Sequence, residues 1–339
     1  MNAKTPSRLF GTAVAAGIAT GTVLAMAAPA AAAERMIFAT QQSGTMYYTL
    51  ATGFSKMLTG KLGRKVAVQP YSGSSVYLPL INAGEATLAF SSSLDAHAAY
   101  QGTDRKALKN MRAIARIWPL KVAMMARAKS GIKSIGDMKG KRVVVGFKGQ
   151  KAMGMVIRAM MASGGVSVKD VKAITVGNVV AGNKALIEGN VDVTFIAVGI
   201  PLVKRAHAAI PGGVSYVDLA GGNTSAKFLA SKAGGIYPTM LTPAKRMPEV
   251  TKPITIVAFD IFLLTSAKTP DADVKAVLAA VSDNFKGLQK DYPPLRRGRA
   301  DKFAAATNTL PYHKAAITYY KSKGMWGAAN DNQEKSFAK

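Results

Sequence analysis

The chain has 339 residues, with 45 lysines and arginines against 18 aspartates and glutamates, and its formal net charge is +27 at pH 7. It contains no cysteine, which excludes disulfides, thiolate metal sites, a cysteine nucleophile and lipid attachment through an N-terminal cysteine. The positive charge attracts anions. Because the basic residues are spread along the chain and form no basic tail, they favour a small anionic ligand, and a nucleic-acid binder ranks last among the alternatives.

Residues 1–33 have the pattern of a secretory signal peptide. Lys4 and Arg8 give a charged start, LFGTAVAAGIATGTVLAM is apolar, and AAPAAAAE supplies small residues for cleavage. We expect cleavage after Ala33, with Ala28 as an alternative. No other segment is long and apolar enough to cross a bilayer, so the sequence predicts a soluble, non-lipidated protein of the periplasm.

Strands, polar loops and helices alternate after this leader. RMIFAT (35–40) predicts a strand, and apolar residues three and four apart in 48–58 predict a helix. The loop between them, 41–45, therefore leads into a helix N-terminus, where free N–H groups favour an anion. The following predicted elements are a strand at 65–71, a helix at 76–84, a strand at 86–92 and a helix beginning near Asp95.

The middle of the chain repeats this plan. LINAGEATLAF (80–90) and LIEGNVDVTF (186–195) both run from helix to glycine to strand to phenylalanine, which suggests two α/β lobes built alike. The predicted elements here are a strand at 141–147, a Gly-containing loop at 148–151, helices at 153–165 and 180–190, and strands at 172–178 and 191–198.

Two apolar strands are predicted to connect the lobes. KVAMMAR (121–127) leaves the first lobe, and KPITIVAFDIFLLTSA (252–267) returns the chain to it. A helix then begins near Pro270, with an apolar face at spacings of three and four. The predicted division is a signal peptide at 1–33, the first part of lobe I at 34–123, lobe II at 124–256, and the return to lobe I with C-terminal helices at 257–339.

No catalytic motif appears in the sequence. His97, His207 and His313 lie far apart, and there is no H-E-x-x-H, G-x-S-x-G or phosphate-binding P-loop. The acidic residues form no cluster typical of acid–base chemistry or a metal site, and Asp192 and Asp260 are interpreted as structural carboxylates. The sequence therefore predicts a protein that is not an enzyme and holds no metal or cofactor.

Several motifs together resemble one family. They are SGTMYYTLA, SGSSVYLPLINAGEATLAF, SGIKSIGDMKGKRVVVG, ALIEGNVDVTF, IYP and, near the end, HKAAITYYKSKGMW. In order and spacing the chain resembles, over nearly its whole length after the leader, the TAXI class of solute-binding proteins of TRAP transporters. That resemblance implies a two-lobed α/β fold of the type II periplasmic-binding-protein kind, with a ligand cleft between the lobes.

The resemblance also implies a function. Such receptors bind a dicarboxylate, a 2-oxo acid or glutamate and deliver it to a small and a large membrane subunit, driven by an ion gradient. The chain departs from the family pattern at Met46 before the tyrosine pair, at Tyr77 where asparagine is usual, and at 148–151, where Lys-Gly-Gln-Lys replaces Gly-Ser-Gly-Thr. These departures keep the cleft and leave the identity of the ligand open.

The polar loops after the strands are the predicted ligand site, because ligands of open α/β sheets lie beyond the carboxyl ends of strands. Simple helix capping by Ser43 or Thr45, and a solvent-exposed Lys151, are the alternatives for individual residues. Arg116 and Arg127 are weaker candidates for pairing with a carboxylate. The predicted ligand-binding residues are Ser43, Gly44, Thr45, Tyr47, Ser74, Ser75, Ser92 and Ser93 from lobe I, and Gln150 and Lys151 from lobe II.

The sequence thus predicts a periplasmic receptor for a small organic anion, with a monomer as the default expectation and no nucleic-acid partner. One alternative is the receptor of an ABC importer for an organic or aromatic acid. Another is a periplasmic enzyme or a sensor-associated ligand domain.

Overall fold

Ten strands form one mixed sheet in the computed structural model, which describes residues 35–103 and 105–337. The predicted signal peptide lies outside the described residues. The strand order is β2-β1-β3-β10-β4-β7-β5-β6, with β8 added to β4 and β9 added to β10. The strands are β1 Met36–Gln41, β2 Val66–Tyr71, β3 Leu88–Ser92, β4 Met111–Arg127, β5 Arg142–Phe147, β6 Lys172–Val176, β7 Val193–Ala197, β8 Val214–Tyr216, β9 Ile236–Leu241 and β10 Ile254–Ser266.

A helix lies at each predicted position, whereas the sequence pattern predicts neither the helix at 201–209 nor the one at 226–232. The helix expected near Asp95 begins at Ser93, because the Ser92 hydroxyl accepts a hydrogen bond from the Asp95 N–H at 2.9 Å and caps it. The helices are α1 Met46–Leu62, α2 Ser74–Ala83, α3 Ser93–Gln101, α4 Met153–Ser163, α5 Val179–Glu188, α6 Pro201–Ala209, α7 Ala226–Lys232, α8 Asp271–Asp291, α9 Lys314–Ser322 and α10 Ala328–Ser336, with a short 3₁₀ helix, η4, at Pro293–Arg297.

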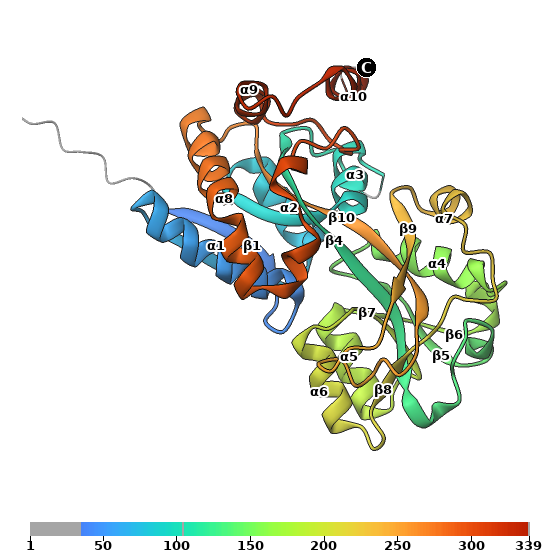
Figure 1. The fold of residues 1–339 in the computed structure, drawn as a ribbon. Coiled ribbons are helices and arrows are strands. Elements are labelled where there is room, and N and C mark those ends of the chain that lie inside the picture. The colour runs from blue at the N-terminus through green and yellow to red at the C-terminus, as the bar shows by residue number, and fades with distance from the viewer. Residues whose placement is uncertain (1–34, 104, 338–339) are drawn as a thin grey trace, which may run out of the picture. The chain divides into compact units, whose positions relative to one another are not determined.

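Two long antiparallel strands, β4 and β10, run side by side through the middle of the sheet (Figure 1). β10 pairs with β3 near one end and with β9 near the other, while β4 pairs with β7 and β8. The predicted lobe boundaries, 123/124 and 256/257, fall within these two strands, which continue without interruption. The division into lobes at these positions stays a prediction.

The structure extends β4 well beyond the predicted strand 121–127, back to Met111. Pro119 lies inside the strand opposite Asp260, and the register with β10 shifts nearby. Proline cannot donate to a ladder and is typical of irregular positions in sheets, which hid the strand from the sequence pattern.

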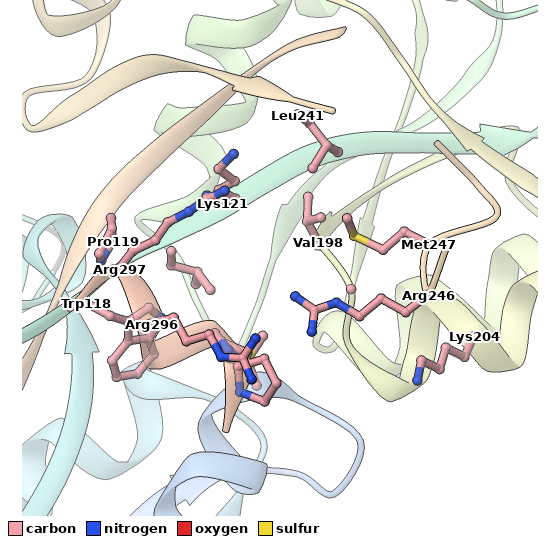
Figure 2. A pocket seen from close by; sticks show the side chains of 15 residues that line it. Trp118, Pro119, Lys121, Val198, Lys204, Leu241, Arg246, Met247, Arg296 and Arg297 are labelled. Carbon is pink, nitrogen blue, oxygen red and sulfur yellow. The ribbon is translucent and has the colours of Figure 1, made fainter. Parts of the chain in front are cut away.

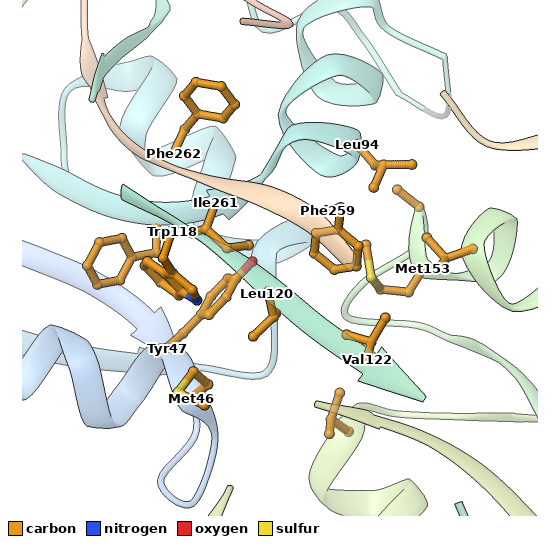
Figure 3. Packing of buried hydrophobic residues seen from close by; sticks show 14 of the residues in the cluster. Met46, Tyr47, Leu94, Trp118, Leu120, Val122, Met153, Phe259, Ile261 and Phe262 are labelled. Carbon is orange, nitrogen blue, oxygen red and sulfur yellow. The ribbon is translucent and has the colours of Figure 1, made fainter. Parts of the chain in front are cut away.

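Aromatic side chains fill the core between β3, β4 and α1. Phe90 lies with its ring centre 5.0 Å from that of Trp118, 4.9 Å from Phe38 and 5.1 Å from Phe54. Tyr47 packs edge-on against Trp118, with ring centres 6.2 Å apart, and Figure 3 shows it beside Trp118 and Leu120. Edge-to-face pairs of this kind add stabilisation beyond the burial of apolar area.

Candidate functional site

Two of the predicted ligand loops are directly bonded to each other. The N–H of Ser75, after β2, donates to the Gly149 carbonyl oxygen, after β5, at 2.9 Å. The N–H of Lys151 donates to the Ser75 hydroxyl oxygen at 3.2 Å. Loops from the two ends of the sheet thus meet, as expected if they surround one cleft.

Glycine is required at this contact because the two backbones approach closely. A Cβ atom on Gly73 would lie 2.2 Å from the Gly149 carbonyl oxygen, and one on Gly149 would lie 2.8 Å from the Ser72 carbonyl oxygen. Real Cβ atoms do not come so near to backbone oxygens, so a side chain at either position would push the loops apart.

The loop before α1 caps its helix and packs against α6. The Thr45 hydroxyl accepts a hydrogen bond from the Tyr48 N–H at 3.2 Å and donates to the Gln42 carbonyl oxygen at 2.8 Å. Gly44 has a φ of +89°, and a Cβ there would lie 3.1 Å from the Leu202 side chain. Ser43 is exposed. Thr45 therefore performs the capping role considered as its alternative.

A buried carboxylate organises two of the predicted serines. The hydroxyls of Ser74 and Ser92 donate to Oδ2 of Asp95 at 2.9 and 3.1 Å, and Asp95 is 5% exposed. These two hydroxyls thus already have a hydrogen-bond acceptor within the protein. Ser93 differs, since its buried hydroxyl has no hydrogen-bond partner among the described residues.

An arginine outside the predicted set also holds this region. Arg105 donates from Nη1 to the Ser75 carbonyl oxygen at 2.8 Å and from Nη2 to the Ser75 hydroxyl at 2.9 Å. Lys151 contributes its backbone N–H, while its side chain is exposed. The cation nearest the Ser75 loop therefore comes from a residue that no sequence motif marked.

The hollow between the predicted loops is small and mostly apolar. It has a volume of about 30 Å³ and is lined by three predicted residues, Thr45, Tyr47 and Gln150, together with side chains such as Met153 and Phe195. A space of that size holds about one water molecule. As it stands, the hollow is too small for a metabolite.

Tyr47 stays a neutral phenol in this hollow. It is 3% exposed, and burial, aided by the nearby Tyr77 and Asp95, raises its pKa well above the ordinary value. A neutral hydroxyl can donate a hydrogen bond to an anion.

The arginines considered as weaker candidates bond within the protein. Arg116 makes two hydrogen bonds to Asp260 at 2.6 and 2.7 Å, which raise its pKa. Arg127 donates to the Leu186 and Ile187 carbonyl oxygens at the end of α5 at 2.8 and 2.9 Å. Asp192 likewise pairs with Arg142 at 2.6 Å, so both aspartates interpreted as structural have arginine partners.

A second, larger cavity lies next to this hollow and is strongly basic. Its volume is about 360 Å³, and Met46 and Leu120 line both cavities. Figure 2 shows the guanidinium group of Arg246 extending toward the side of the cavity where Arg296 lies. The charged lining residues are Lys121 on β4, Lys204 on α6, Arg246 after β9, and Arg296 and Arg297 on η4, with no aspartate or glutamate among them.

None of these five cations forms an ion pair within the described parts of the chain. Lys121 donates to the Met240 carbonyl oxygen, and Arg296 lies 3.4 Å from the Gln289 carbonyl oxygen. Arg296 and Arg297 belong to the short basic group RRGR (296–299), but because basic residues are spread along the whole chain, no sequence pattern marked this cavity.

The model of one protein family matches residues 38–324. The chain belongs to the NMT1-like family. The TAXI subclass suggested by the motifs is a finer assignment than this match makes.

Several solved structures are similar to this NMT1-like chain. The alkanesulfonate-binding protein SsuA from Xanthomonas axonopodis pv. citri, bound to MOPS, has a TM-score of 0.50 at 16% identity and covers 89% of this chain and 83% of its own. MatC from Rhodopseudomonas palustris, with bound malate, has a TM-score of 0.54 at 15% sequence identity, and the match covers 89% of this chain and 98% of MatC. PhnD1 from Prochlorococcus marinus, in complex with methylphosphonate, has a TM-score of 0.55 at 11% sequence identity, and the match covers 86% of this chain and 99% of PhnD1.

These similarities confirm the predicted fold class, a type II periplasmic-binding-protein fold of mixed α/β structure. Between residues 35 and 337, leaving out 104, no helix of the NMT1-like chain is long and apolar enough to span a membrane. In the same residues, no three histidine, aspartate or glutamate side chains gather in a way that could hold a metal ion.

Proposed function

We propose that this NMT1-like protein is a periplasmic solute receptor that binds a small organic anion between two lobes and delivers it to the membrane subunits of a transporter. The contact between Ser75 and Gly149 carries this proposal, because it joins loops from the two ends of the sheet beside the small hollow lined by Thr45, Tyr47 and Gln150. The ligands in the three similar structures, MOPS, malate and methylphosphonate, all carry an acidic group, which supports an anionic solute.

The ligand would bind when the two loops separate and then close around it. The first N–H groups of α1, the Tyr47 hydroxyl and the unpartnered Ser93 hydroxyl are donors from the first lobe. Gln150, which is buried at the contact, and the N–H groups of the 149–151 loop are donors from the second lobe. A ligand that contacts both sides favours the closed state by its difference in affinity for the two states.

The roles of Ser74 and Ser92 in this proposal are indirect. Their hydroxyls hold Asp95, so they orient the start of α3 and of α2 around the cleft. Ser43, Gly44 and Thr45 shape the loop that leads into α1, and Ser75 and Lys151 form the bonded contact that a ligand would replace.

For the transporter, we propose the TRAP type, with a small and a large membrane subunit, because the chain carries the motifs of the TAXI class in order. Uptake in membrane vesicles distinguishes this from the ABC alternative. Uptake that collapses with the ion gradient and needs no ATP supports a TRAP transporter. Uptake that requires ATP and survives loss of the gradient would assign the protein to an ABC importer.

Thermal unfolding of the purified protein tests the receptor function. The panel contains dicarboxylates, 2-oxo acids, amino acids and aromatic acids, with sulfate and phosphate as controls. We expect one class to stabilise the protein saturably, by about 2.7 kcal/mol at a hundred times its Kd. Gln150→Ala should reduce this shift, and the ligand should be recovered unchanged. Equal shifts with every anion, or none, would contradict the proposal.

A further inference from the structure

We propose that the basic cavity is a second ligand site, separate from the cleft between the loops, which binds an anion with two or more acidic groups on an apolar body. Its charged residues come from four elements far apart in sequence: β4, α6, the segment after β9, and η4. None of the ten residues predicted for the cleft lines it.

The charge of the cavity favours an anion of more than one unit. Five cations surround a space of about 360 Å³, and no acidic side chain lines it. Like charges held near one another repel, and an anion between them removes that repulsion. Arg246 and Arg296 extend toward the same space in Figure 2, so guanidinium groups from two elements can bond to one ligand.

The remaining lining is apolar, which distinguishes this cavity from a site for an inorganic ion. The volume lies within the range of about 300–1,000 Å³ that is typical of small-molecule sites. A ring or a short hydrocarbon would fill the space between the charged groups, whereas phosphate would leave it wet. The uncharged lining residues are Met46, Trp118, Pro119, Leu120, Val198, Gly199, Leu241, Met247, Pro293 and Pro294.

A bound ligand would link segments that are distant along the chain. In Figure 2, Arg296 and Arg297 of η4 lie on one side of the cavity, and Lys204 of α6 and Arg246 lie on the other. Because Met46 and Leu120 also line the small hollow, the two cavities share a wall.

Calorimetric titration with three ring acids tests the proposal. The probes are benzoate, isophthalate and benzene-1,3,5-tricarboxylate, which carry one, two and three carboxylates on the same ring, at 150 mM salt. We expect the Kd to fall at each step and to be at least about tenfold lower for the tricarboxylate than for benzoate. Arg246→Ala and Arg297→Ala should each weaken tricarboxylate binding by about tenfold or more, as loss of a charged hydrogen bond does.

Two variants serve as controls. Lys172→Ala removes an exposed charge on β6, outside the cavity, and should leave the tricarboxylate Kd unchanged. Gln150→Ala should also leave the tricarboxylate Kd unchanged, although it should reduce the stabilisation by the ligand of the cleft. The second site and the proposed function can therefore be refuted independently of each other. Absence of saturable tricarboxylate binding, equal affinity for benzoate, or an equal effect of Lys172→Ala would overturn the second site.

Discussion

The N–H of Ser75 donates to the carbonyl oxygen of Gly149, and this bond joins the first turn of α2, which follows β2, to the loop after β5. It forms because Gly73 and Gly149 have no side chains, so that two backbones can touch. The contact lies next to Gln150, which lines the small hollow, so in the proposed function the two glycines control how closely the loops can approach around a ligand.

Gly73→Ala should separate the two loops. The new Cβ would lie 2.2 Å from the Gly149 carbonyl oxygen, and relief of that clash should lower the free energy of unfolding by about 1–3 kcal/mol. Urea unfolding measures the loss, and solution scattering should show a larger radius of gyration. Gly177→Ala is the matched control, because a Cβ there meets nothing within 4 Å. Equal stability of the two variants would show that the contact does not hold the loops together.

Arg116→Met should destabilise the pairing of β4 with β10. It leaves Asp260 with only a 3.3 Å hydrogen bond from the Tyr237 hydroxyl, in a setting where the two charged side chains are 24% and 17% exposed. We expect a loss of about 2–3 kcal/mol in the free energy of unfolding. Asp260→Asn alone and in combination with Arg116→Met completes a double-mutant cycle, which measures the interaction free energy of the two side chains.

The exposed pair Arg299–Asp301 is the comparison for this prediction. Its side chains are 67% and 57% exposed, so Arg299→Met should change stability little. A coupling between Arg116 and Asp260 no larger than that of the exposed pair would contradict a structural role for the bidentate bridge.

Stability should fall below neutral pH because of His313. This residue is 1% exposed and caps α9, where its Nδ1 accepts a hydrogen bond from the Ala315 N–H at 3.2 Å. Burial lowers its pKa from the ordinary 6.5, although Asp271 opposes this, while Arg112 and Lys314 add to it. The stabilisation is complete above the pKa that His313 has in the unfolded chain, and it is lost as the pH falls through the lower pKa of His313 in the folded protein. Between these two values the free energy of unfolding falls by up to about 1.4 kcal/mol per pH unit.

His313→Asn should remove this part of the pH dependence, because asparagine can cap a helix and does not titrate. Urea midpoints of the two proteins are compared from pH 8 to pH 5. The wild-type protein should lose more stability than the variant over that range. Parallel profiles would show that protonation of His313 is not coupled to folding.

Arg246→Gln should stabilise the protein when no polyanion is bound. Removal of one of five neighbouring cations relieves repulsion, and the gain should be about 0.2–0.5 kcal/mol at low ionic strength. The midpoint of thermal unfolding should rise at 10 mM salt and change little at 500 mM. Lys172→Gln, with the same charge change outside the cavity, should gain less. A gain independent of salt would indicate a cause other than charge.

Much of the fold could be predicted because its signals are local. The apolar spacing in 48–58 and in 274–285 specifies helices α1 and α8, and short apolar runs specify β1, β3 and β7. The positions of the polar loops followed from the same pattern, since strands of an α/β sheet present their carboxyl ends at one edge.

The sequence by itself determined the alternation of strands and helices, the small polar loops and the excess of positive charge. Only the tertiary structure decided that Ser74 and Ser92 face Asp95, that Arg116 holds Asp260, and that Lys121, Lys204 and Arg246 share one cavity with η4. The physical reason is range: hydrophobic periodicity acts within one element, whereas charge pairing and cavity lining depend on distances between elements that no local pattern encodes.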